Sequence, residues 1–287
     1  MQTNEIDVCN MDIFGEGTRH FWLSDLDGLL ERFPNWELPH KQNFYSLLFI
    51  SSGVGKVEID HQTFKIDGSC SVIIKPRCIS SIHLARNAKG KIICFTEDFF
   101  SLRYNNNILY QFSFLQLEAL PFLRLTTQQV EKCMLLIGLL ADEYGLKKRE
   151  TQKVLRSYLN ILLYEFERIN NPNGIKRTKT VKQEKIREFE LLIDRYFDKK
   201  KLPSAYAEII HMSPNYLNKI CKEETGQTAG EMIRKRVILE AQRLLHYTNY
   251  SVNEIAEKLG FDSVSYFVTF FKKTTRTTPE KFRKIEV

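Results

Sequence analysis

The hydrophobic pattern changes its period along the chain. In the first part, short runs rich in β-branched and aromatic residues alternate with polar turn residues. The runs lie at 44–49, 56–59, 63–66, 71–74 and 91–95, with turns at 60–62 and 67–68. Several short strands at this spacing predict a small β-barrel or a double-sheet jelly roll. Such barrels often enclose a small-ligand cavity, although the alternation does not fix which side chains face it.

Two longer segments, at 127–144 and 150–169, have apolar residues at helical spacing. The recurring positions are Val130, Met134, Ile137 and Ala141 in the first, and Val154, Tyr158, Ile161, Leu162, Glu165 and Phe166 in the second. Additional leucines widen the apolar surface beyond one stripe, so both helices must be covered. We expect this pair, within 126–170, to pack on the strands and also to form a homodimer. Packing on the strands alone is the simpler alternative.

Residues 171–181 are the clearest linker. Pro172 stops a helix, the pair Asn173 and Gly174 favours a turn, and no apolar periodicity crosses the segment. Beyond it every periodic segment is helical, with helices expected at 182–199, 204–210, 229–246 and 252–259 and two more after Ser213 and Ser263. The sequence therefore predicts an all-α domain over 182–287.

One pattern occurs twice in this domain, fifty positions apart. Residues 213–222, SPNYLNKICK, align with 263–272, SVSYFVTFFK. Each copy follows a shorter helical pattern, so each is typical of a helix-turn-helix unit, and two such units can enter successive major grooves of DNA. Ser213 is placed to cap the first copy, and either Asp262 or Ser263 the second. Ser251 and Glu254 have capping-box spacing, and Gly260 is placed to end that helix in the left-handed conformation.

The outward faces of the two repeated helices supply the candidate DNA contacts. Asparagine matches adenine edges and lysine reaches guanine or phosphate, while the methyl groups of Val268 suit a thymine methyl. A polar helix face is also typical of simple solvation, but its place on the second helix of the motif favours DNA contact. The predicted residues are Pro214, Asn215, Asn218, Lys219 and Lys222 in the first unit, and Ser263, Ser265, Val268, Thr269 and Lys272 in the second.

The helix expected at 229–246 connects the two units. Its length of ~27 Å approaches the ~34 Å between neighbouring major-groove faces once the width of the units is added. Arg234 and Lys235 are predicted to meet phosphate. Arg236 fits either a phosphate contact or an internal ion pair, and the sequence leaves both open.

The charge distribution agrees with this interpretation. The 287 residues carry a net charge of +7. Residues 1–170 have 19 basic and 20 acidic side chains, a balance of −1, whereas 171–287 have 23 and 15, a balance of +8. A basic domain of this size attracts polyanions.

The sequence also indicates a compartment and argues against several chemistries. The six cysteines form no CxxC pair and fit reduced, buried thiols. No apolar run is long enough for a membrane span or a signal peptide, so we expect a bacterial cytoplasmic protein at the nucleoid. The chain has no HxH metal pair, P-loop, GxSxG or HExxH motif, and we predict no catalytic residue, metal or cofactor. His83 follows an apolar strand, and we interpret it as a core or rim residue.

A longer motif in the C-terminal part resembles the AraC-type (arabinose-regulator-like) transcription factors. It comprises Arg236, Ala241, Leu244, Leu245, Ser251, Glu254–Ala256, Leu259–Phe261, Tyr266, Phe267, Phe271–Lys273, Pro279, Phe282 and Arg283. The resemblance covers about 182–284. It implies a double helix-turn-helix that binds double-stranded promoter DNA and usually activates transcription together with RNA polymerase. It also implies a cupin-like N-terminal domain, here 1–125, that often senses a small-molecule effector and dimerises.

Two positions depart from the family pattern. Arg276 stands where the family commonly has Gly, and Gly226 holds the equivalent place in the first unit. A positive φ at Arg276 would cost about 1 kcal/mol. Thr269 stands where the family often has Arg. We therefore expect the first unit to carry more of the specificity, so that replacing Asn218 or Lys219 weakens binding more than replacing Thr269.

The resulting prediction is an α+β protein with an N-terminal cupin-like β-barrel, two helices and an all-α domain containing two helix-turn-helix units. Three functions follow. The first is a ligand-responsive transcription activator. The second is a regulator that answers to a partner protein or only dimerises. The third is a cupin-type enzyme with an accessory DNA domain, which the missing metal ligands disfavour.

Overall fold

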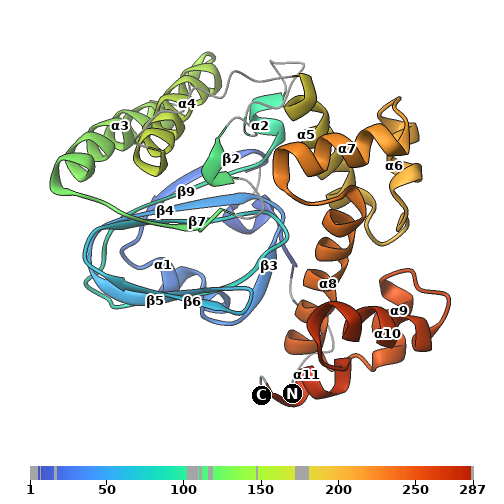
Figure 1. Cartoon of the computed structure of the whole chain (residues 1–287). Helices are drawn as coiled ribbons and strands as arrows, with labels where there is room; N and C mark the ends of the chain where they lie inside the picture. Colours follow the sequence, from blue (N-terminus) through green and yellow to red (C-terminus); the bar gives the residue numbers. More distant parts are fainter. Residues whose placement is uncertain are drawn as a thin grey trace. The chain divides into compact units, whose positions relative to one another are not determined.

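The computed structural model describes residues 8–15, 18–101, 112–115, 119–146, 148–171 and 181–285, together with Ile6 and Leu109 (Figure 1). Two compact units are present, one within residues 7–175 and one within 176–287. Most of the predicted linker, 172–180, lies outside the described residues. We describe each unit by itself.

The N-terminal unit contains two five-stranded sheets. The first has the order β1 (Val8–Cys9), β3 (His40–Gln42), β8 (Ile79–Leu84), β5 (Val54–Ile59) and β6 (Gln62–Asp67). The second has the order β10 (Phe122–Arg124), β7 (Cys70–Ile74), β4 (Tyr45–Ser52), β9 (Lys89–Phe95) and β2 (Phe21–Asp25). Of the two arrangements that the sequence left open, hydrogen-bond pairing therefore shows a double sheet.

Strand β4 explains how the second sheet is covered. Leu48 and Ile50 belong to the apolar core that both sheets share, whereas Leu47 and Phe49 belong to the core formed with the helices. Alternate side chains of a strand point to opposite faces, so this sheet is buried on both sides. A strand buried on both sides is apolar throughout, which is why 44–49 reads as one continuous run.

Aromatic side chains fill much of the core between the sheets. Phe14 stacks on Trp22 with ring centroids 4.0 Å apart, and Trp36 and Phe44 each meet the same Phe14 ring edge-on. Helix α1 (Leu29–Arg32) and the 3₁₀ turns at Met11–Phe14 and Pro34–Glu37 contribute to this cluster. Phe14, Phe33 and Trp36 come from these turns and their flanks rather than from strands. Helix α2 (Asp98–Ser101) and the turn at Ser113–Leu115 instead contribute Phe99 and Phe114 to the core beneath the long helices.

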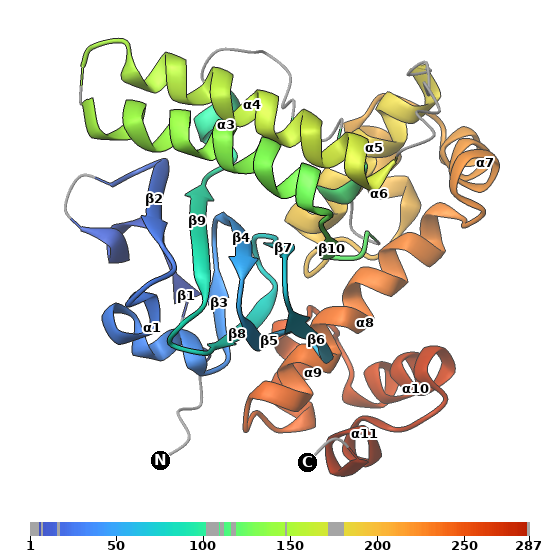
Figure 2. The same ribbon diagram turned by 90° about the vertical axis from the view of Figure 1, so that its left-hand side faces the viewer.

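Helices α3 (Thr127–Leu146) and α4 (Thr151–Asn170) lie side by side across the second sheet (Figure 2). Their buried stripes match the predicted ones in part, because Ile137, Leu162, Glu165 and Phe166 are buried as predicted. Cys133, Ile137 and Leu140 are buried on α3, whereas Met134 is 53% exposed. On α4, Ile161 is 45% exposed. Several leucines flank each stripe, so the apolar period alone did not fix which side faces the sheet.

Every regular element described from residue 181 onward is a helix, which confirms the predicted α+β fold. These elements are α5 (Val181–Tyr196), α6 (Pro203–Ile209), α7 (Pro214–Thr225), α8 (Ala229–Tyr247), α9 (Val252–Lys258), α10 (Val264–Thr275) and α11 (Pro279–Ile285). One apolar core, with Phe189, Leu217, Val237 and Phe267 fully buried, runs through all of them except the partly buried α11. Helices α6 and α7 lie at one end of α8, and α9 to α11 at the other (Figures 1 and 2).

Candidate nucleic-acid interface

Helix α7 is the reading helix of the first unit. The Ser213 hydroxyl accepts a hydrogen bond from the Tyr216 amide at 3.2 Å, and Pro214 fills the first turn, where no amide donor is needed. Gly226 ends the helix in the left-handed region, with φ 74°. Leu217 and Ile220 are fully buried. The opposite face is exposed at Pro214, Asn215, Lys219 and Lys222.

Helix α10 repeats this construction in the second unit. Ser263, rather than Asp262, caps the helix, because its hydroxyl accepts from the Tyr266 amide at 3.4 Å. Phe267 and Phe271 are fully buried. Ser263, Ser265, Thr269 and Lys272 are exposed, as the sequence predicted. Thr269 also donates its hydroxyl hydrogen to the Ser265 carbonyl at 2.9 Å, so its donor is used within the helix.

The turns before the two reading helices are built alike. His211 and Gly260 both have positive φ, 54° and 69°. The following amides of Met212 and Phe261 each donate to the carbonyl of an alanine in the second half of the preceding helix, at 2.9 Å in both units. The second unit has one more residue before its cap. The repeat distance is therefore 49 in the turns and 50 in the reading helices.

Asn218 has a structural partner that the sequence reasoning missed. Its Oδ1 atom accepts a hydrogen bond from the Ala229 amide at 3.1 Å, at the start of α8. Bidentate recognition of adenine needs both the oxygen and the amide donor of an asparagine. One of the two lone pairs of the Asn218 oxygen is thus used within the protein, which ties its half-buried side chain to the start of α8. Its predicted base contact stays a prediction.

The sequence explains why the second unit lacks this hydrogen bond. Fifty residues after Asn218 and Ala229 stand Val268 and Pro279. Proline has no amide hydrogen to donate, so an asparagine there would lose this partner. Val268 is half-buried and Pro279 is buried. The absence of a backbone N–H at Pro279 therefore explains why residue 268 is apolar, in addition to the predicted thymine contact.

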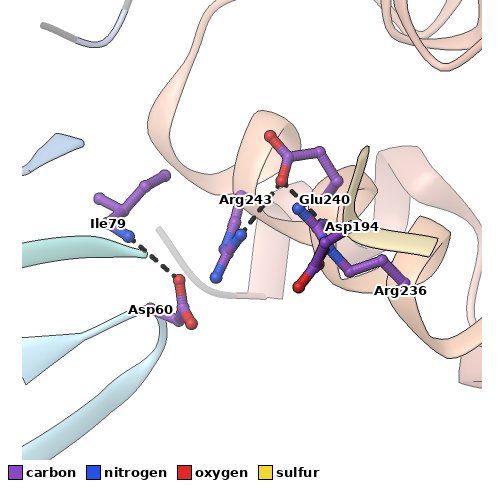
Figure 3. A network of polar contacts seen from close by, with 6 residues as sticks. All are labelled: Asp60, Ile79, Asp194, Arg236, Glu240 and Arg243. Carbon is purple, nitrogen blue, oxygen red and sulfur yellow. Dashed lines mark hydrogen bonds and ion pairs between the residues drawn. The ribbon is translucent and has the colours of Figure 1, made fainter. Parts of the chain in front are cut away.

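Helix α8 resolves the choice that the sequence left open for Arg236. Its guanidinium is 3% exposed and donates to Asp194 at 2.7 Å and to Glu240 at 3.1 Å (Figure 3). The same group lies 4.0 Å from the centre of the Phe197 ring. Arg243 also donates to Glu240, at 3.1 Å. Arg236 is an internal ion-pair partner that joins α5 to α8.

Arg234 and Lys235, by contrast, are both exposed on α8. The helix spans 19 residues, which corresponds to about 28 Å. Two predicted phosphate contacts therefore remain accessible on the helix that joins the reading units. This agrees with their predicted role, which stays a prediction.

Capping boxes begin α8 and α9. The predicted pair Ser251 and Glu254 is confirmed, and Thr228 and Glu231 form a second box at α8 that the sequence reasoning missed. The hydrogen bond from the Thr228 backbone lowers the pKa of Glu231. The Ser251 hydroxyl does the same for the pKa of Glu254. These boxes fix where the connecting helix α8 and the first helix of the second unit start.

Two exposed tyrosines were also missed. Tyr216 and Tyr266 occupy the same position of the two reading helices and are 45% and 63% exposed. The repeat itself aligns them, so the signal was present in the sequence. An exposed aromatic with a hydroxyl beside the predicted contacts adds a hydrogen-bonding group to each outward face.

Comparison with known proteins places this domain in a family. Residues 206–285 match the family described as Helix-turn-helix domain. The chain is 34% identical over 93 residues to the bifunctional transcriptional activator/DNA repair enzyme AdaA of Bacillus subtilis, a match that covers 32% of this chain and 44% of that protein. It is 37% identical over 78 residues to the xylose operon regulatory protein of Escherichia coli K12, covering 27% and 20%. Over this domain the chain is therefore similar to the AraC-type regulators, as the sequence motif predicted.

The similarity of the AraC-type domain extends to a solved structure. The C-terminal domain of AraT, a response regulator from Geobacillus stearothermophilus, is 30% identical, with a TM-score of 0.35, and the match covers 37% of this chain and 88% of that one. The chain spans less than half the length of the two curated relatives named above.

The N-terminal unit offers less chemistry. Among the described residues, no cluster of His, Cys, Asp or Glu could hold a metal ion. None of the described helices is both long and apolar enough to cross a bilayer.

All six cysteines are free thiols, and burial raises the pKa of Cys133 to about 11. His83 is half-buried on β8, where its ring lies 3.3 Å from the Ser81 hydroxyl. An open hollow of about 630 Å³ is lined by Ser24, Asp25, Asp27, Arg32, Arg86, Asn87, Ala88, Lys89 and Gly90.

Proposed function

We propose that this protein is a sequence-specific DNA-binding transcription regulator, and an activator, that acts on bacterial promoters at the nucleoid. The observation that carries the proposal is the duplicated reading unit: α7 and α10 are capped alike, buried alike and exposed on the same polar face. Lys219, Lys222 and Lys272 give these faces positive charge. Similarity of the C-terminal domain to AraC-type regulators supports the same conclusion.

The proposed mechanism starts from the connecting helix. Helix α8 carries one reading helix at each end, so one chain can engage two neighbouring major grooves. Arg234 and Lys235, exposed between them, are placed to contact the intervening phosphates. Asn215, Lys219, Ser265 and Thr269 face the bases. Recruitment of RNA polymerase then gives activation.

The test is selection of a duplex from a random library by the purified full chain, followed by gel shifts. Lys219→Ala should weaken binding to the selected duplex strongly. Arg234→Ala should weaken all duplexes similarly and reduce the salt slope of log K by about 1. Lys153→Ala, an exposed change on α4, is the charge-matched control and should leave binding unchanged. Failure to enrich any duplex contradicts the proposal.

We further propose that the N-terminal unit forms a homodimer through α3. Met134, Leu135 and Leu139 are exposed on this helix at 53%, 67% and 38%. Gly138 and Gly145 lie on the same helix, and a Cβ added to either would meet nothing within 4 Å. Each glycine costs about 1 kcal/mol relative to alanine in a helix, and no described part of the chain packs against either glycine to offset that cost. Close approach of a second helix supplies a reason.

Sedimentation of the full chain tests the dimer. Leu135→Glu should shift the protein to a monomer. Leu120→Glu changes a residue that is 70% exposed outside the helices and serves as the control. A Leu135→Glu chain that sediments like the unchanged protein contradicts this interface.

Two modes of control can be separated by experiment: binding of a small-molecule effector and binding of a partner protein. The only tryptophans of the chain, Trp22 and Trp36, both lie in the aromatic core between the sheets. Binding of an effector to the N-terminal unit should therefore change their fluorescence in the full chain and raise its melting temperature. A partner protein should instead bind with no response to small molecules. A cupin-type enzyme is a third candidate, and metal analysis of the purified protein tests it.

A further inference from the structure

Lys201 connects the segment that precedes the first reading unit to the turn of the second unit. It lies between α5 and α6, before the first unit, and its ammonium donates to three backbone carbonyls. These belong to Phe197 at 2.9 Å, Asp198 at 2.7 Å and Leu259 at 2.5 Å. The first two follow α5, whereas Leu259 belongs to the turn of the second unit. The ammonium also lies 5.2 Å from the centre of the Phe261 ring.

The chemistry of this contact is specific. An ammonium has three donors, and here all three are used. The carbonyls stand at the C-terminal ends of α5 and α9, where backbone oxygens lack partners within the helix and carry partial negative charge. One side chain thus satisfies carbonyls at the ends of two helices, and the carbonyl of Leu259 lies 58 positions from Lys201 in the sequence.

Gly260 shows that the two backbones approach closely at the same point. A Cβ atom built on Gly260 would lie 1.9 Å from the Asp198 carbonyl oxygen. Gly226, at the end of the first reading helix, has nothing within 4 Å of the same position. Glycine is therefore required at position 260 both for the positive φ and for the close approach of the two backbones. The turn of the second unit packs directly on the connection between α5 and α6.

We propose that Lys201 and Gly260 form a clamp that fixes the second reading helix relative to the first, and so sets the spacing of the two DNA segments that one chain reads. Lys201 is a positioning residue, because its donors are used on the protein backbone. Helix α8 joins the units in sequence and one apolar core packs them together. The clamp adds a polar connection between the loop before the first unit and the turn of the second. The consequence for DNA rests on the proposed function, whereas the fixed orientation does not.

The orientation is tested first without DNA. Spin labels at Tyr216→Cys and Tyr266→Cys report the distance between the reading helices in a full chain that carries serine at Cys9 and Cys78. The distance distribution should be narrow in this background and clearly broader after Lys201→Met. Lys199→Met removes a positive charge from the same loop, where the side chain is exposed, and should leave the distribution narrow. An unchanged distribution after Lys201→Met overturns the clamp.

The effect on DNA is tested with the duplex selected by the unchanged protein. Spacer variants move the two contacted segments by one base pair, which is about 3.4 Å along the duplex. The unchanged protein should lose about tenfold in affinity per step, as for a lost base contact. Lys201→Met should bind the best duplex more weakly but vary less than about threefold across spacers.

This spacer dependence separates positioning from a loss of folded protein. A chain that is merely destabilised binds every duplex less well and keeps the steep dependence on the spacer. That result with Lys201→Met overturns the proposal, as does a flat dependence in the unchanged protein. Gly260→Ala is the second variant, and circular dichroism establishes that each chain is folded. If no duplex is enriched, the proposed function fails, and the spin-label distances still decide the clamp.

Discussion

Arg276 offers the sharpest test of the local energetics. It ends helix α10 with φ 67° and ψ 1°, in the left-handed region. Backbone strain was expected here because the family commonly has Gly at this position. Gly226 ends α7 in nearly the same conformation, with φ 74° and ψ −4°. The two units thus carry one glycine and one arginine at equivalent backbone positions. Replacing Arg276 by glycine should relieve the strain.

The expected magnitude follows from two opposing effects. A residue with a Cβ atom in this region costs roughly 1–2 kcal/mol. Glycine lowers the free energy of unfolding by about 0.4–1 kcal/mol, because it makes the unfolded chain more flexible. The net gain for Arg276→Gly is therefore about 0.5–1 kcal/mol. Asparagine tolerates the left-handed region better than arginine, so Arg276→Asn should fall between the two.

Thermal unfolding of the full chain measures this gain. For a domain of this size the gain corresponds to a rise in Tm of about 2–6 °C. Far-ultraviolet circular dichroism follows the helical C-terminal unit. Tryptophan fluorescence follows the other unit, because Trp22 and Trp36 both lie there, and it should show no shift.

The reciprocal change closes the test. Gly226→Arg places a side chain in open space at the equivalent position, and it should lower stability by about the same 0.5–1 kcal/mol. A neutral or destabilising Arg276→Gly, with a destabilising Gly226→Arg, would refute the equivalence of the two positions. It would mean that Arg276 makes a contact worth more than its backbone strain.

Three further predictions concern charge and DNA contact. Hydrogen bonds hold the pKa of Glu254 below its ordinary value of 4.5, so its carboxylate stabilises the fold above that pH and loses this effect as the pH falls through the folded-state pKa. The difference in urea midpoint between the unchanged protein and Glu254→Gln should therefore shrink on acidification. A difference that stays constant with pH contradicts this prediction. Arg236→Ala removes one partner of a buried ion pair and should cost about 3 kcal/mol in chemical unfolding, and a loss below about 1 kcal/mol would show that the pair contributes little. Lys219→Ala should weaken DNA binding more than Thr269→Ala in gel shifts, because the Thr269 hydroxyl already donates within its helix; the reverse order sinks the view that the first unit dominates.

Most helices of the C-terminal unit could be predicted from the sequence to within one residue at each end, whereas α5 ends three residues before its predicted end and α11 was not predicted. The connecting helix was expected at 229–246 and spans Ala229–Tyr247. Caps fix such boundaries locally, and the side chains of Ser213, Ser251 and Ser263 cap where the pattern placed them. Local hydrogen bonds depend on residues three positions apart, so a single sequence is enough to show them.

Features that depend on distant residues were not predictable in the same way. Strands β2 and β8 were missed because residues 21–25 and 79–84 mix serine with apolar side chains and gain their place by pairing with distant strands. The hydrogen bond between Asn218 and Ala229 joins two helices, and no helical wheel of one helix shows it. Only the comparison of the repeats, with Val268 and Pro279 at the matching places, gives that contact a sequence signature.

The central claim is that one chain reads two successive major grooves, and methylation interference at guanine N7 tests it most directly, since that atom lies in the major groove. With the selected duplex and the full chain, interference should fall in two clusters on one face, about 10–10.5 base pairs apart. Lys219→Ala should weaken one cluster and leave the other in place. A single cluster, or two clusters on opposite faces of the duplex, would contradict the account.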